Sequence, residues 1–136
     1  MTIEIESSCE CGAVRATASG KPAIQLCCHC ADCQTATNLP YASIVFFRID
    51  QVVIEGEVKA QEFIAESGSA TSRDSCGNCG SVMFDRSAGF PALLGIMAQR
   101  LVEPFTFEPA CHVWAASKQA GVDIPKGIKV YEKGIG

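Results

Sequence analysis

The chain has 136 residues, 48% hydrophobic and 19% charged, a composition that predicts one folded domain over residues 1–136 and excludes a disordered chain. Its formal net charge is −4 and its basic residues are scattered, so we predict no nucleic-acid partner. The beginning of the chain resembles no secretion leader, and no apolar run approaches the ~18 residues of a membrane span. We therefore expect a cytoplasmic protein with no membrane partner.

Short strands are predicted along most of the chain, because apolar runs alternate with breaks that carry Gly, Pro, Asn or Asp. The first strand contains Ile3 and Ile5, and the others are expected at 13–18, 23–27, 41–47, 52–55, 62–66, 81–86 and 92–97. A short helical turn is predicted over 31–36, and a polar loop over 68–74. The pattern predicts an all-β fold with short helical turns.

Nine cysteines are the most unusual feature of the composition. In a reducing cytoplasm, metal binding or catalysis explains them better than disulfides do. Seven of them fall into three closely spaced groups, namely Cys9 with Cys11, then Cys28, Cys30 and Cys33, and then Cys76 with Cys79.

The first and last groups are pairs that can share one metal ion. In extended backbone, Cys9 and Cys11 point to the same face. The turn from Cys76 to Cys79 contains Gly77 and Asn78, residue types that adopt the tight conformations needed to wrap around a metal. Four thiolates suit a closed tetrahedral site, so we predict one structural zinc here. The alternative is a redox dithiol or a set of buried thiols.

The middle group has three well-spaced cysteines and no obvious fourth ligand. Three protein ligands and one open position are typical of catalytic zinc, so Cys28, Cys30 and Cys33 predict a second, labile zinc. The alternative is a second structural zinc that is completed by a neighbouring or distant side chain, with His29, Cys27 and His112 as the candidates.

The remaining residues of interest have simpler predicted roles. His29 lies between two expected ligands, and in extended backbone its side chain would face away from them. Cys27 and Cys111 are expected to pack as small hydrophobic residues. His112 is expected to be a structural histidine, and Trp114 is expected to belong to the core.

The motifs and their order resemble the glutathione-dependent formaldehyde-activating enzyme family, which includes the centromere protein V-like proteins. The matching segments are Cys9-Glu-Cys-Gly-Ala-Val14, Cys28-His-Cys-Ala-Asp-Cys33, Arg73-Asp-Ser-Cys-Gly-Asn-Cys-Gly-Ser81 and Pro109-Ala-Cys-His-Val-Trp114. The resemblance implies an Mss4-like fold of β-sheets pinned by zinc. It also implies a structural zinc on Cys9, Cys11, Cys76 and Cys79, and a labile catalytic zinc on Cys28, Cys30 and Cys33.

The activity implied by the resemblance is that of a carbon–sulfur lyase. Its substrate would be a thiol–aldehyde adduct, with glutathione as the thiol and formaldehyde as the small aldehyde. Arg73 and Arg48 are candidates for contacting an anionic substrate such as glutathione. The chain departs from the family pattern after Cys33, where many relatives have Arg and then Gly but this chain continues with Gln34. The alternative function is a non-catalytic zinc module that binds a protein partner.

Overall fold

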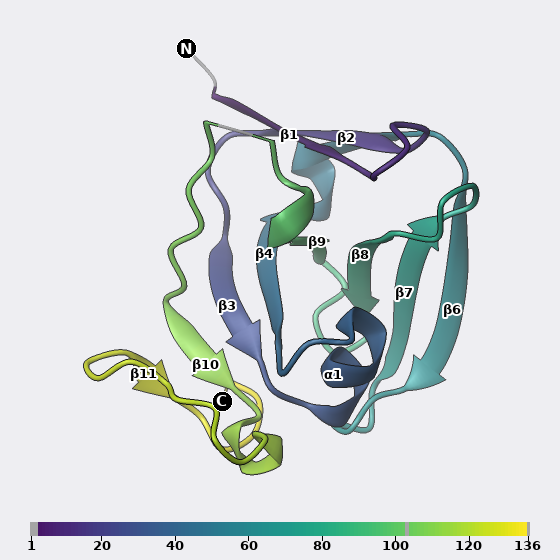
Figure 1. Cartoon of the computed structure of the whole chain (residues 1–136). Helices are drawn as coiled ribbons and strands as arrows, with labels where there is room; N and C mark the ends of the chain where they lie inside the picture. Colours follow the sequence, from purple (N-terminus) through teal and green to yellow (C-terminus); the bar gives the residue numbers. More distant parts are fainter. Residues whose placement is uncertain (1–2, 103, 136) are drawn as a thin grey trace.

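The computed structural model describes residues 3–102 and 104–135, and in them strands form two sheets. The smaller sheet has the order β1-β2-β5 and the larger has the order β11-β10-β3-β4-β9-β8-β7-β6. The strands are β1 Glu4–Ser8, β2 Arg15–Ser19, β3 Ile24–Cys28, β4 Ala42–Arg48, β5 Val52–Glu55, β6 Val58–Ile64, β7 Ala70–Cys76, β8 Val82–Ser87, β9 Leu93–Met97, β10 Cys111–Val113 and β11 Lys129–Val130. In Figure 1, β1 and β2 lie across one end of the larger sheet, and α1 (Ala31–Thr37) lies near the other end.

The larger sheet is covered on both faces, and β4 shows why. Ile44 and Phe46 pack into one hydrophobic cluster, while Val45 and Phe47 pack into another, as the period of two in a strand requires. The cluster around Val45 and Phe47 also includes Ala16 and Ala18 of the smaller sheet, so it forms the core between the two sheets. The continuous apolar run of β4 is therefore that of a strand buried on both sides.

Helical structure is limited to short elements. α1 begins after Cys30, whose Sγ accepts a hydrogen bond from the Cys33 backbone N–H at 3.4 Å, and it ends at Asn38 in the left-handed conformation with φ 55°. Three further 3₁₀ turns cover Ile49–Gln51, Ala98–Arg100 and Ala115–Ser117. The prediction of an all-β, Mss4-like fold with short helical turns is confirmed. No helix in the described residues is both long enough and apolar enough to cross a membrane.

The prediction of a polar loop over 68–74 is wrong, because β7 begins at Ala70. Two charged side chains of this strand, Arg73 and Asp74, are buried, and each is paired with a residue of β8. Arg73 Nε lies 3.3 Å from an Asp85 carboxylate oxygen, and Asp74 lies 3.0 Å from Arg86 Nη2. These pairs satisfy the charges without the apolar alternation that marks most strands. The neighbouring strand β6 likewise begins before the predicted residues 62–66.

A glycine fixes the point where the chain leaves the smaller sheet for the larger one. Gly56 lies between β5 and β6 with φ +100°, and a Cβ there would overlap the backbone oxygen of Ala13.

We expect Gly56→Ala to lower the free energy of unfolding by about 3 kcal/mol, from backbone strain and the steric clash together. Urea unfolding of the metal-loaded protein measures this change. Gly68 is the control because it has φ +86° but open space around it, so Gly68→Ala should cost only about 1 kcal/mol. Equal losses would show that the contact with Ala13 is unimportant.

Candidate metal centres

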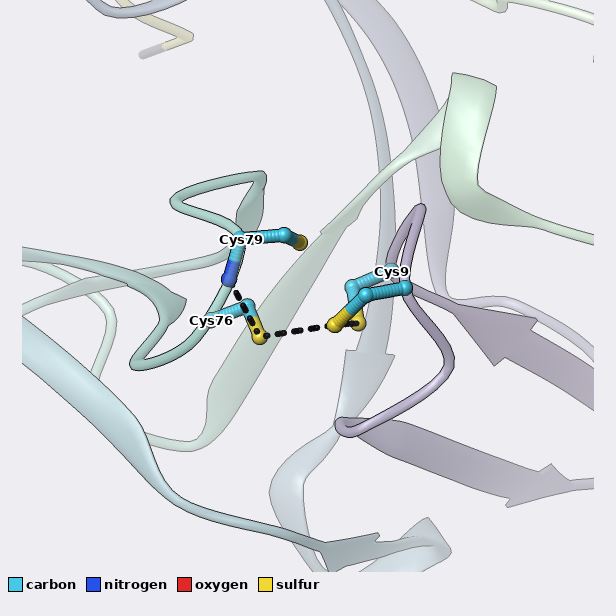
Figure 2. Close-up of side chains that lie close together, drawn as sticks. Cys9, Cys76 and Cys79 are labelled. Atoms are coloured by element: carbon cyan, nitrogen blue, oxygen red, sulfur yellow. Dashed lines mark hydrogen bonds between the residues drawn. The ribbon is translucent and has the colours of Figure 1, made fainter.

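Four cysteines from distant parts of the sequence meet where the smaller sheet joins the larger one. Cys9 and Cys11 lie in the turn after β1, Cys76 ends β7, and Cys79 lies in the turn before β8. Figure 2 shows the Cys76–Cys79 turn facing the loop that carries Cys9, with the sulfurs turned toward one another. All four sulfurs lie within 4.8 Å of one another. The group therefore connects β1 of one sheet to β7 of the other.

The sulfur spacing in this group suits a tetrahedral metal ion. The Cys9 and Cys11 Sγ atoms are 3.6 Å apart, and those of Cys11 and Cys76 are 3.7 Å apart. Sulfurs at the corners of a tetrahedron around zinc, each about 2.3 Å from the metal, are roughly 3.8 Å apart. A disulfide would instead bring two sulfurs to about 2.05 Å.

Hydrogen-bond donors surround these sulfurs, as expected for a group of thiolates. The backbone N–H groups of Asn78 and Cys79 both donate to Cys76 Sγ at 3.4 Å, and the Val14 N–H donates to Cys9 Sγ at 3.3 Å. The Asn78 side chain also donates to Cys11 Sγ at 3.3 Å. Sequence reasoning assigned Asn78 a conformational role, but the left-handed residue of this turn is Gly80, with φ 77°. Asn78 acts instead through its two donors.

The second group is more deeply buried and comes from one short segment. Cys28 ends β3, Cys30 caps α1, and Cys33 lies in the first turn of the helix. The three sulfurs lie within 4.8 Å of one another, with 3.4 Å between Cys28 Sγ and Cys30 Sγ. Hydrogen bonds from Cys28 and Cys33 lower the pKa of Cys30 to about 3, which favours its thiolate form. All three residues are buried.

Arg73 joins this group from β7. Its Nη2 donates to Cys33 Sγ at 3.1 Å, and its Nε donates to Asp85 at 3.3 Å. A buried guanidinium in this position would offset part of the negative charge of three metal-bound thiolates. Arg48, the other arginine singled out from the sequence, is exposed and pairs with Asp50 at 3.3 Å. Only Arg73 of these two therefore reaches the group.

In the described residues, no fourth histidine, cysteine or acidic side chain joins the three sulfurs. His29 is fully buried, and its Nε2 lies 2.8 Å from His112 Nδ1, so the two rings contact each other. Burial lowers the pKa of His112, and burial together with the nearby His112 lowers that of His29 to about 4. Cys27 and Cys111 are buried thiols outside both groups, and burial raises the pKa of Cys27 to about 11. His29, Cys27 and His112, the candidates for a fourth ligand, therefore lie outside the three-cysteine group.

A cavity of about 430 Å³ adjoins the three-cysteine group, and Cys28, Cys30 and Cys33 form part of its wall. Trp114 also lines the cavity, and it is partly buried against the hydrophobic cluster that contains Phe46. It therefore belongs only in part to the core, where the sequence predicts it. The four-cysteine group contributes nothing to this wall. The two groups thus differ in ligand number and in access to a ligand-sized space.

Gln34, which occupies the position where the family resemblance led us to expect arginine, has a structural role. Its Nε2 donates to the backbone oxygens of His29 at 2.7 Å and Ser117 at 2.8 Å, and its Oε1 accepts from Gln119 at 2.9 Å. Gln34 therefore ties α1 to the segment that follows β10. It does not line the cavity.

Two β-sheets joined by four cysteines, with three more cysteines at a cavity, define a cysteine-rich all-β protein with two candidate metal centres. The model of the glutathione-dependent formaldehyde-activating enzyme family matches residues 4–117. The chain belongs to this family.

A comparison with solved structures supports the fold. A crystal structure of a Rhodobacter sphaeroides protein is similar with a TM-score of 0.58 and 18% sequence identity, over 74% of this chain and 90% of that chain. At this identity the similarity shows the fold alone. No curated protein sequence matches the chain significantly.

Proposed function

We propose that the protein is a zinc-dependent carbon–sulfur lyase that forms and cleaves adducts between a thiol and an aldehyde. The family description names glutathione and formaldehyde, so S-(hydroxymethyl)glutathione is the first adduct to test. The observation that carries the proposal is the difference between the two cysteine groups. Four sulfurs lie together at the junction of the sheets and could fill a tetrahedral site, while three sulfurs line a cavity and would leave one position of such a site to a ligand.

The proposed residues have separate roles. Cys9, Cys11, Cys76 and Cys79 would hold a structural zinc, and Cys28, Cys30 and Cys33 would hold a labile catalytic zinc. A free thiol has a pKa of ~8.5 and is mostly protonated at neutral pH. Zinc bound at the second group would favour the thiolate form of a substrate thiol. Arg73, held by Asp85, places a positive charge beside Cys33.

The alternative function, a non-catalytic zinc module that binds a protein, requires a second site saturated by side chains. The described residues offer three sulfurs there and no fourth ligand, which favours the enzyme. We also propose that the protein works in the cytoplasm, where a reducing environment keeps thiols available for metal. The absence of any disulfide among its nine cysteines, all of which lie in described residues, supports this proposal.

The proposed activity predicts faster exchange between free glutathione, formaldehyde and their adduct in the presence of the protein. NMR exchange spectroscopy measures this rate against the spontaneous reaction.

The purified protein should contain about two zinc ions per chain, and a mild chelator should remove one of them without unfolding the protein, because an open three-ligand site binds more weakly. The exchange rate should fall to the spontaneous value on chelation and recover when zinc is added. A second zinc that resists chelation, together with no acceleration, would favour the binding module.

A further inference from the structure

The cavity beside the three-cysteine group is mainly apolar. The aliphatic and aromatic side chains of its wall include Leu26, Ile44, Phe46, Phe90, Leu93 and Trp114. Phe90 stacks edge to face on Phe46 with 5.5 Å between the ring centroids, so the two rings form a continuous aromatic surface. Phe90 is 43% exposed, which places it where the cavity meets solvent. Such a surface favours an apolar ligand.

The cavity is also much larger than formaldehyde. A water molecule accounts for about 30 Å³ of liquid volume, and formaldehyde has only one more non-hydrogen atom than water. The 430 Å³ of the cavity would therefore remain mostly unfilled around this aldehyde. A longer aldehyde would instead bury several methylene groups there, each of which favours binding.

The charged groups of the wall do not suit the carboxylates of glutathione. They are Asp32, Arg73 and Asp85 among the described residues, two acidic side chains and one basic. Asp85 already pairs with Arg73, and Asp32 accepts a hydrogen bond from the Glu66 backbone N–H at 3.1 Å. No second cation is present in this wall for a dicarboxylate. The wall therefore offers one cation to an anionic substrate, and most of its remaining surface is apolar.

One polar group in the wall lacks a partner. Arg73 is 6% exposed, and its Nη1 has no hydrogen-bond acceptor, although Nε and Nη2 contact Asp85 and Cys33. A buried donor without an acceptor is unfavourable, so an acceptor that binds beside it is stabilised. Because Nη2 contacts Cys33 Sγ, this donor lies at the sulfur end of the cavity.

We propose that the aldehyde substrate of this site carries an apolar chain or ring that fills the cavity, with its carbonyl oxygen accepting a hydrogen bond from Arg73. This inference rests on the proposed function and names its aldehyde class, medium-chain aliphatic or aromatic aldehydes in place of formaldehyde. In the reaction, the thiol sulfur bonds to the carbonyl carbon, the C=O π bond breaks, and the proton of the thiol ends on the oxygen as a hydroxyl. The reverse reaction breaks the same C–S bond.

A binding experiment tests the proposal without catalysis. Trp114 is the chain's only tryptophan and lines the cavity, so its fluorescence reports a bound ligand. The probes are hexanamide, an unreactive analogue with a carbonyl oxygen, and acetamide, which lacks four of its methylene groups. We expect hexanamide to bind about a hundredfold more tightly, as burial of four methylenes implies.

Two variants locate the binding site. Phe90→Ser removes a ring from the cavity wall and should weaken hexanamide binding by about tenfold. Ile54→Ser is the matched control, because Ile54 is 39% exposed but lies on β5, away from the cavity. The control should bind hexanamide as the original protein does. Equal binding of hexanamide and acetamide, or equal effects of the two substitutions, would overturn the proposal.

Activity measurements separate this inference from the proposed function. With glutathione as the thiol, hexanal should give a higher kcat/KM than formaldehyde. Acceleration with formaldehyde but no binding of hexanamide would overturn the apolar aldehyde and leave the lyase intact. Tight hexanamide binding without acceleration for either aldehyde would overturn both the lyase and the assignment of the bound molecule as its substrate.

Discussion

Cys76→Ser is expected to leave the chain unfolded at room temperature. Cys76 is 2% exposed, its sulfur contacts Cys11, and it accepts hydrogen bonds from two backbone N–H groups. Structural zinc contributes about 10–16 kcal/mol of apparent binding free energy in small peptides. That range is comparable to the roughly 5–15 kcal/mol by which a whole domain is stable. Near-ultraviolet circular dichroism and zinc content, measured on the purified variant, should both show the loss.

Cys111→Ser provides the control for this experiment. Cys111 is 3% exposed and so is buried to the same extent, but its sulfur belongs to neither cysteine group. Replacing it introduces a hydroxyl into the core and should cost only about 1–3 kcal/mol, with the zinc content unchanged. A folded Cys76→Ser protein with its full zinc content would show that the four-cysteine group is not a structural metal site.

Cys30→Ser is expected to give a folded protein that has lost one zinc and the proposed activity. The core between the two sheets does not include Cys30, so the sheets keep their packing and their four-cysteine group. Substitution of residues that hydrogen-bond to metal ligands lowers activity or metal affinity by about 10–100-fold. Loss of a ligand itself should have a larger effect, so we expect the exchange rate to fall by more than about a hundredfold. Circular dichroism, zinc content and the NMR exchange rate give the three readouts.

Cys27→Ser is the matched control because Cys27 is a buried cysteine next to Cys28 that belongs to neither group. It should keep both zinc ions and the exchange rate. If Cys30→Ser and Cys76→Ser unfolded alike, or if both remained active, the proposed division between a structural and a catalytic metal would be wrong.

The cysteine groups were predictable because their members are close in sequence or form pairs with recognisable turns. Cys28, Cys30 and Cys33 span six residues, so local backbone geometry brings their sulfurs together. Asp85 lies in an ordinary strand and carries no such signal. Its contact with Arg73 depends on the pairing of β7 with β8, which places the two residues opposite each other. Long-range register of this kind cannot be read from spacing along one chain.

The strands that were missed share a physical cause. β7 is polar where it is buried, because its charges are paired with β8. β10 and β11 have only three and two residues, and they exist because β10 pairs in parallel with β3 on one side and β11 on the other. Such short segments have no periodicity of their own.

Strand β7 carries Arg73 and, three residues later, Cys76. Arg73 lines the cavity, while Cys76 packs into the core between the sheets, so the two side chains use opposite faces of the strand. A one-residue insertion or deletion between them would turn one of the two away from its partners. Substitution of the two intervening residues should therefore be tolerated better than an insertion or deletion between Arg73 and Cys76. Both centres depend on this spacing, so a change in its length would damage one of them.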